Sequence, residues 1–146
     1  MKRHTSLAIL SREHHHALIL AQLLKKGAPI YKGLPTDLNG KAEYAFQFYH
    51  DELIKHFDAE ERSIIKKIRG INADLDRLCD EIVTEHQYLK GLFTSIKNTI
   101  DLATQLDKTG YALELHIRKE EREFFPLVQE LCSAKLLSEI EQELSV

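Results

Sequence analysis

One pattern, His-x-x-x-Glu-Glu-Arg followed by paired apolar residues, occurs twice in the chain, in residues 56–68 and again in residues 116–128. On an α-helix, side chains four positions apart lie on the same face. The His and the first Glu of each copy can therefore reach one point in space together. Two such His/Glu pairs are what a dinuclear metal site inside a helix bundle requires.

Helical periodicity extends well beyond the repeat, because apolar residues recur three and four positions apart nearly everywhere and no segment alternates as a strand does. We expect an all-α fold, an antiparallel up-down four-helix bundle with a short helix near the C-terminus, in a single domain of residues 1–146. The expected helices start at a Thr5 or Ser6 cap and run to about Lys26, then from about Lys41 to Gly70, from Asn72 to about Leu106, from about Tyr111 onward, and from about Ala134 to Leu144.

Breaks in this periodicity indicate how the helices connect. Gly and Pro residues between positions 27 and 40 predict one long loop, and Asp107-Lys108-Thr109-Gly110 predicts a tight turn. Pro126 should bend or break the last long helix, since a proline inside a helix lacks the backbone donor. The inward-facing stripes are expected to include Ile100 and Leu115.

Each of the four long helices carries one inward-facing His, and the two repeats add a Glu one turn later. The candidate metal ligands are His14, His56, Glu60, His86, His116 and Glu120. Burying two carboxylates among Leu, Ile and Phe costs several kcal/mol each unless a cation balances them. Imidazole and carboxylate donors together suit iron, manganese or zinc, and a carboxylate from each of two helices can bridge two metal ions.

The first helix contains three consecutive histidines, of which only one can point at the centre of the bundle. His14 lies on the apolar stripe, whereas His15 lies at its edge and remains an additional or alternative ligand. Glu61 and Glu121, one position beyond each candidate ligand, should point away from the centre as solvated charges. His50 is expected to be solvated or capping, and His4 to lie in a disordered surface segment.

Composition excludes several classes of function. The net charge of −3 provides no basic face for nucleic acid, and no apolar run approaches the roughly 20 residues of a membrane span. Cys79 and Cys132 form no Cys-x-x-Cys pair, so we interpret them as reduced, packed thiols. We expect a cytoplasmic protein that is a monomer or a weak homo-oligomer.

These residues together resemble the hemerythrin-like, or HHE cation-binding, family over nearly the whole chain. The resemblance rests on Leu10-Ser11-Arg12-Glu13-His14, His56-Phe57-Asp58-Ala59-Glu60-Glu61, Glu85-His86, and His116-Ile117-Arg118-Lys119-Glu120-Glu121 leading to Phe125-Pro126. It implies a four-helix bundle around two iron ions, bridged by two carboxylates and an oxo or hydroxo group. It also implies dioxygen, another small diatomic molecule or peroxide as the ligand. Zinc or manganese stays an alternative to iron, because imidazole and carboxylate donors suit these metals too.

The chain departs from the oxygen-carrying members of that family, which have His-x-x-x-His on the third helix, because Lys90 stands four positions after His86. They also have His-x-x-x-x-Asp on the last helix, where this chain has Glu120 and Glu121. One imidazole is therefore missing, and four His with two Glu is closer to the bacterial iron–sulfur repair proteins.

Three hypotheses about function follow. The first is a non-enzymatic di-iron protein that senses, stores or buffers dioxygen or iron. The second is a redox enzyme or iron donor in nitric oxide or peroxide stress or in iron–sulfur cluster repair, so the residues leave open whether the protein is an enzyme. The third is a metal-free interaction bundle with Leu136, Leu137 and Ile140 as its partner surface.

Overall fold

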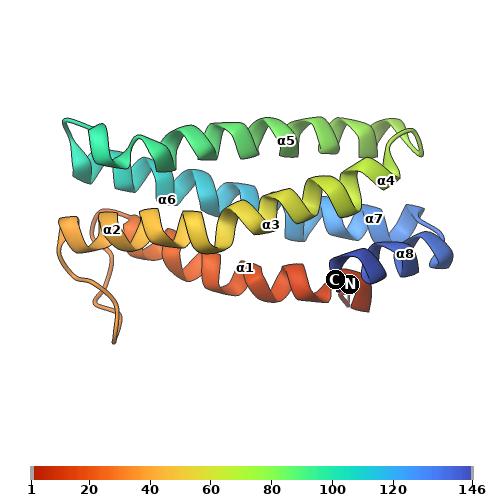
Figure 1. Ribbon diagram of the computed structural model, residues 1–146, viewed down its shortest axis with the longest axis horizontal. Coiled ribbons are helices and arrows are strands. Elements are labelled where there is room, and N and C mark those ends of the chain that lie inside the picture. The colour runs from red at the N-terminus through yellow and green to blue at the C-terminus, as the bar shows by residue number, and fades with distance from the viewer. Residues whose placement is uncertain (1, 146) are drawn as a thin grey trace.

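The computed structural model describes residues 2–145, and every regular element in that range is helical, which confirms the all-α class (Figure 1). The elements are α1 (Thr5–Leu24), α2 (Leu38–Phe48), η1 (Tyr49–Leu53), α3 (Ile54–Ala59), η2 (Glu60–Ile65), α4 (Lys66–Ile68), α5 (Ala73–Thr94), η3 (Ile96–Asn98), α6 (Leu102–Lys119), η4 (Glu120–Phe124), α7 (Phe125–Leu131) and α8 (Ala134–Leu144). Elements η1, η2 and η4 are π-helical and η3 is a 3₁₀ turn.

The elements form a helical bundle in which α6 lies against α1 and α5, and α2 contacts α1, α5 and α6 (Figure 1). Residues 38–68 and residues 102–131 are two uninterrupted helical runs, each widened by π-helical turns. The short helix α8 has the bounds expected from the sequence and packs on α1 and η2. No helix of residues 2–145 is both long enough and apolar enough to cross a membrane.

Pro126 does not break the last long run, contrary to one of the two expected outcomes. The π-helical turn η4 precedes it, and α7 continues through it. In a π-helix the proline nitrogen would face the carbonyl of Glu121 five positions earlier, and proline has no hydrogen to donate to it. Arg3 satisfies this carbonyl instead, since its Nη2 donates to the Glu121 oxygen at 2.9 Å.

The boundary between the third and fourth long helices was predicted wrongly. Helix α5 ends at Thr94, and α6 begins at Leu102 rather than at Tyr111. The Asp101 carboxylate caps α6 by accepting from the Thr104 N–H at 3.1 Å. At the first helix the expected Thr5 or Ser6 cap is also wrong, because His4 Nδ1 accepts from the Ser6 N–H at 3.0 Å.

Gly110 lies inside α6, and not in the turn that Asp-Lys-Thr-Gly suggested. A Cβ atom at this position would lie 2.6 Å from the Ala21 carbonyl oxygen of α1. The glycine therefore permits the close approach of α1 and α6, which a larger residue would block.

Replacing Gly110 with alanine should lower the free energy of unfolding by about 1–3 kcal/mol, because backbone must move to admit the methyl group. Gly91→Ala is the matched control, since a Cβ there has no neighbour within 4 Å. That change should stabilise the chain by about 0.5–1 kcal/mol through helix propensity. Urea unfolding of both variants measures the contrast, and equal effects would contradict the packing argument.

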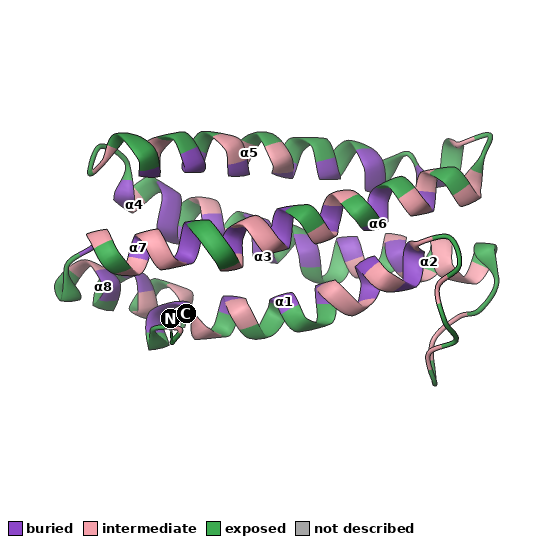
Figure 2. Cartoon of the chain, turned by 180° about the vertical axis from the view of Figure 1, so that it is seen from behind, coloured by how far each residue is buried: buried purple, intermediate pink, exposed green. Residues whose placement is uncertain are grey.

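Two apolar clusters fill the bundle at different levels along its axis, and buried residues line the inward faces of all its long helices (Figure 2). The first cluster includes Leu10, Ile82 and Phe124, and the second includes Leu89 and Ile117. Each long helix passes from one cluster to the other across a single polar level.

Three apolar predictions need correction or refinement. Ile100 and Leu115 were expected to face inward, but their exposed fractions are 106% and 70%. Leu137 and Ile140 are buried within the first cluster, so they do not offer the free partner surface of the third hypothesis. The side chain of Leu136 packs partly buried against the same cluster.

Candidate metal centre

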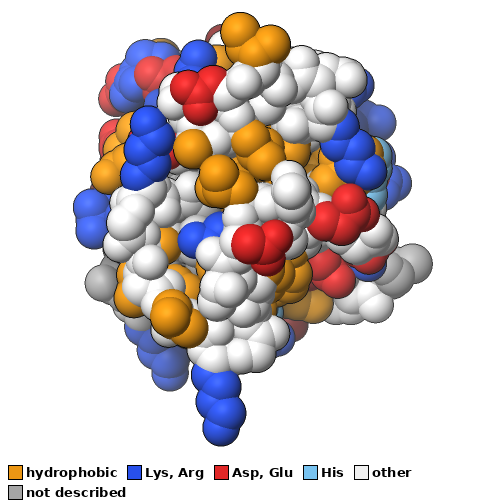
Figure 3. All heavy atoms as spheres, turned by 90° about the vertical axis from the view of Figure 1, so that its left-hand side faces the viewer, with side chains coloured by type: hydrophobic (Ala, Val, Ile, Leu, Met, Phe, Trp, Pro, Cys, Tyr) orange, Lys and Arg blue, Asp and Glu red, His pale blue; other side chains and the backbone are white. Residues whose placement is uncertain are grey.

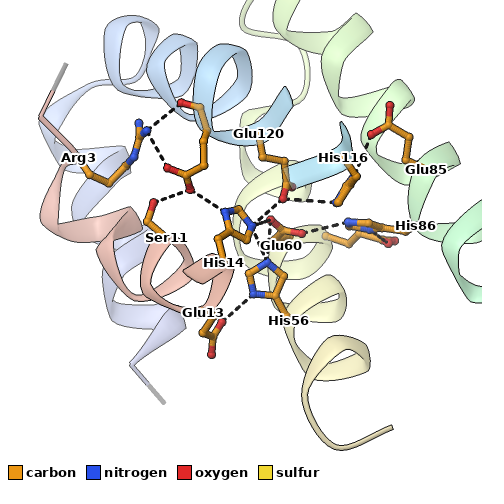
Figure 4. A network of polar contacts seen from close by, with 12 residues as sticks. Arg3, Ser11, Glu13, His14, His56, Glu60, Glu85, His86, His116 and Glu120 are labelled. Carbon is orange, nitrogen blue, oxygen red and sulfur yellow. Dashed lines mark hydrogen bonds and ion pairs between the residues drawn. The ribbon is translucent and has the colours of Figure 1, made fainter. Parts of the chain in front are cut away.

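All six candidate ligands lie together between the two apolar clusters, and each is at most 5% exposed (Figure 4). They come from every long helical run of the bundle: His14 from α1, His56 from α3, Glu60 from η2, His86 from α5, His116 from α6 and Glu120 from η4. The sequence repeat is therefore brought together as two halves of one cluster.

The six residues form two overlapping groups, and both carboxylates belong to each. One group is His14, His56, Glu60 and Glu120, and the other is Glu60, His86, His116 and Glu120, each with donor atoms within 4.8 Å of one another. The two oxygens of Glu60 lie 3.3 Å from His56 Nε2 and 3.0 Å from His86 Nε2. Glu120 Oε1 lies 2.9 Å from His14 Nε2 and 3.4 Å from His116 Nε2. Two cations sharing two carboxylates would fit this arrangement.

A second ring of four glutamates holds the outer nitrogens of the histidines. Each Nδ1 lies 2.6 to 2.8 Å from a carboxylate oxygen of a neighbouring helix, in the pairs His14–Glu121, His56–Glu13, His86–Glu61 and His116–Glu85. A carboxylate only accepts, so each Nδ1 carries a proton. Each Nε2 is then left free to face the centre, which is the arrangement that metal-binding histidines adopt.

Glu61 and Glu121 were expected to be solvated charges, and this was wrong. Their oxygens lie 2.7 Å from His86 Nδ1 and 2.6 Å from His14 Nδ1. Both follow the first residue of a π-helical turn, where the extra residue changes which side chains face a neighbouring helix. The paired apolar residues of the repeat were a usable signal, because both members of each pair are buried: Ile64 and Ile65, and Phe124 and Phe125.

Several buried polar atoms of the cluster have no hydrogen-bond partner. They are Glu60 Oε2, His116 Nε2 and both carboxylate oxygens of Glu120. In addition, His14 Nε2 lies 3.0 Å from His56 Nε2, and two lone pairs at that distance repel unless a proton or cation lies between them. Unpaired buried polar atoms are costly, so this donor set fits bound metal cations.

Without metal, the pKa values of the cluster residues also indicate that positive charge is favoured at this site. Burial lowers the pKa of His14, but the nearby carboxylates of Glu120 and Glu121 outweigh it and raise that pKa to about 9. The pKa of His56 is raised in the same way by the Glu60 charge. For Glu120, burial and the charge of Glu60 raise the pKa, whereas for Glu60 the charge of His56 outweighs burial and lowers it. We infer that protons take the place of cations when no metal is bound.

The metal-free protein should lose stability as the pH rises from about 6.5 to 9. The pKa of His14 is higher in the folded protein, so its contribution is complete below 6.5 and is lost as the pH passes about 9. Glu121 affects stability in the acid range. Burial raises its pKa, but the contacts with His14 and Ser11 outweigh burial and lower that pKa to about 2, so its contribution to stability is lost as the pH falls from about 4.5 to 2. Chemical unfolding from about pH 2 to 9 measures the free energy of unfolding in both ranges. His14→Ala should reduce the loss of stability at alkaline pH.

The outer carboxylates are themselves held by neighbouring groups. Ser11 Oγ donates to Glu121 Oε2 at 2.8 Å, and Arg3 Nη2 donates to Glu121 Oε1 at 3.1 Å (Figure 4). Lys119 donates to Glu85 Oε2. Through Glu121 and Glu85, these contacts fix the rings of His14 and His116 indirectly. Sequence spacing does not indicate this role.

The remaining histidines lie outside the cluster. His15, the additional or alternative ligand, is exposed, and its ring contacts His16 with a centroid distance of 5.7 Å. Successive helical residues point about 100° apart, so His14 takes the inward direction and excludes His15. His50 is exposed beside Phe46, in accord with expectation. His4 is ordered as a helix cap, so its assignment to a disordered segment was wrong.

A cavity of about 1000 Å³ leads to the cluster from the end of the bundle that carries the loop of residues 25–37. Figure 3 faces that end, where apolar side chains show between charged ones. Three of the cluster histidines line it, namely His14, His56 and His116, and Tyr44 lines it about 18 Å further along the helical run. The cavity therefore connects these three side chains to solvent.

Comparison with known families gives one match: the family model of the hemerythrin HHE cation binding domain matches residues 5–128. The matched range starts with α1, ends in α7 and contains all six clustered residues. No curated protein and no solved structure matches the chain.

Proposed function

This chain belongs to the hemerythrin HHE cation-binding domain family, and on that premise we propose that it binds two iron ions and senses, stores or buffers dioxygen or iron. The topology we propose with it is the antiparallel up-down four-helix bundle. The observation that carries the proposal is the pair of buried His/Glu groups that share both carboxylates. A single structural ion would need only one of these groups.

The ligands we propose for one ion are His14 and His56, and for the other His86 and His116, with Glu60 and Glu120 shared. Ferrous ions held this way would supply electrons to a small oxidising ligand. The protein's own part is to fix each imidazole through its outer carboxylate and to surround the site with apolar residues that limit water. The cavity supports dioxygen, another diatomic molecule or peroxide as the ligand, because it connects three of the histidines to solvent.

The donor count favours an open position over a closed structural site. Each proposed ion has two imidazoles and two shared carboxylates from the protein, and iron commonly takes more ligands than these four groups provide in a monodentate arrangement. Within residues 2–145, neither group contains a third histidine, and His15 is exposed. Small ligands therefore have a place to bind beside the protein's donors.

Elemental analysis after iron-replete expression, with absorption spectra under nitrogen and then air, tests the proposal. We expect about two iron ions per chain and a near-ultraviolet or visible charge-transfer band that forms in air and reverses under nitrogen. Fewer than about one metal ion per chain, or zinc alone, would refute a di-iron role.

A redox enzyme or iron donor, acting in nitric oxide or peroxide stress or in iron–sulfur cluster repair, is the second candidate. The missing fifth imidazole favours it, because stable oxygen carriage is harder to reconcile with an open centre. It predicts irreversible oxidation in air, and turnover of peroxide or nitric oxide that disappears in Glu60→Ala. A metal-loaded protein inert to both compounds would count against it.

A further inference from the structure

A second hollow of the molecule is a surface groove between α5 and α6, with a volume of about 700 Å³. Its apolar part is formed by Tyr88, Tyr111 and Leu115, whose exposed fractions are 51%, 51% and 70%. Large apolar side chains gathered at one exposed place mark sites where another molecule binds. The periodicity had assigned Leu115 to the core, so a role at the surface explains why an apolar residue occupies this position.

The charged rim of the groove is mostly cationic, although the chain as a whole carries a net charge of −3. Its charged side chains, apart from the histidine at its floor, are Lys108, Arg118, Lys119 and Arg122 against Glu85 and Glu123. Arg118 and Lys119 are paired with acidic side chains of their own surroundings, whereas within residues 2–145 neither Lys108 nor Arg122 forms an ion pair, so these two supply the free positive charge of the rim. An apolar centre with a cationic rim complements an acidic protein surface.

The groove also reaches the candidate metal centre. His116 lines both the groove and the inner cavity. Glu85, another lining residue of the groove, has an oxygen 2.7 Å from His116 Nδ1 (Figure 4). A molecule in the groove is thus separated from the buried carboxylates by a single side chain, and the groove offers a short route between the surface and the centre.

We propose that this groove is the docking surface for an acidic one-electron carrier protein that exchanges electrons with the centre, which rests on the proposed binding of iron. With iron bound between the His/Glu groups, the pair would accept one electron from the reduced iron–sulfur or flavin group of the carrier. The carrier would be oxidised by one electron and the pair reduced by one, and no bond would form or break. A second copy of this chain fits less well, since a two-fold contact would place the same cationic rims against each other.

The kinetic test uses the iron-loaded, oxidised chain mixed without air with chemically reduced plant-type ferredoxin, an acidic carrier. Ferredoxin oxidation, followed by stopped-flow absorption, should slow steeply as salt rises. Leu115→Ser and Arg122→Glu should each slow it by about tenfold or more at low salt. Ile100→Ser and Lys135→Glu are matched controls at exposed positions outside the groove, and they should leave the rate unchanged.

Reduction by dithionite, a small reagent that needs no docking, separates the two proposals. Equal dithionite rates with slowed ferredoxin rates in the groove variants support docking. Equal ferredoxin rates in all variants, or equally fast reaction of the basic carrier cytochrome c, would overturn it while leaving the iron site intact. Loss of dimers in Leu115→Ser by sedimentation would overturn it in favour of self-association.

Binding can also be measured without iron chemistry. Oxidised ferredoxin is titrated into the isotopically labelled, zinc-loaded or metal-free chain, and amide shifts are followed by NMR. Shifts centred on Tyr88, Tyr111 and Leu115 support the docking surface. Absence of shifts, or shifts confined to another face, would refute it even if the chain never held iron.

Discussion

Replacing Glu60 with alanine is expected to reduce bound metal from about two ions to fewer than one per chain. One Glu60 oxygen lies 3.0 Å from His86 Nε2, and the other lies 3.3 Å from His56 Nε2. This single side chain therefore serves both halves of the centre, and its loss weakens both. Elemental analysis of the desalted protein measures the stoichiometry, and circular dichroism shows whether the bundle is still folded.

Glu61→Ala is the matched control, since it deletes the same side chain one position later. Within residues 2–145, the Glu61 carboxylate forms its hydrogen bond and ion pair only with the outer nitrogen of His86, at 2.7 Å. Its removal should keep two ions at saturation but weaken affinity by about 10–100-fold. If Glu60→Ala still bound two ions, or if Glu61→Ala lost as much metal as Glu60→Ala, the shared-carboxylate arrangement would be wrong.

The inner cluster was predictable from the sequence because it depends on spacing within single helices. His56 and Glu60, like His116 and Glu120, are four positions apart, and that spacing places both side chains on one face whatever surrounds the helix. His14 and His86 could be added because each lies on an apolar stripe. The structure brings all six together.

The outer carboxylates were not predictable in this way, because their partners lie on other helices. Glu61 reaches His86 and Glu121 reaches His14 only when the π-helical turns and the packing of neighbouring helices are known. Helix contacts also explain why Gly110 lies within a helix. Its local sequence favours a turn, but the close approach of α1 at Ala21 needs a glycine at this position of α6. The inward prediction for Leu115 was wrong for the opposite reason, since no helix within residues 2–145 covers its side chain.

Removing bound metal with a chelator should lower the Tm by about 8–16 °C. A ligand present at a thousand times its Kd stabilises the folded state by about 4 kcal/mol. In a domain of this size, each kcal/mol shifts Tm by about 2–4 °C. The physical cause is that Glu60 Oε2, His116 Nε2 and both Glu120 oxygens are buried without hydrogen-bond partners when no cation is present. Calorimetry before chelation, after it, and after metal is restored measures the effect.

The doubly substituted His56→Ala, His116→Ala protein is the control, because it lacks one imidazole in each half and should not respond to the chelator. The pH dependence gives an independent check of the cause. His14 and His56 have raised pKa values and hold their protons to higher pH, and metal must displace these protons to bind. Metal affinity should therefore increase between about pH 6.5 and 9. Over this same range the metal-free protein loses stability, and the Tm gap between the two forms should therefore widen as the pH rises. A gap that stayed constant with pH would mean that the metal does not bind at these histidines.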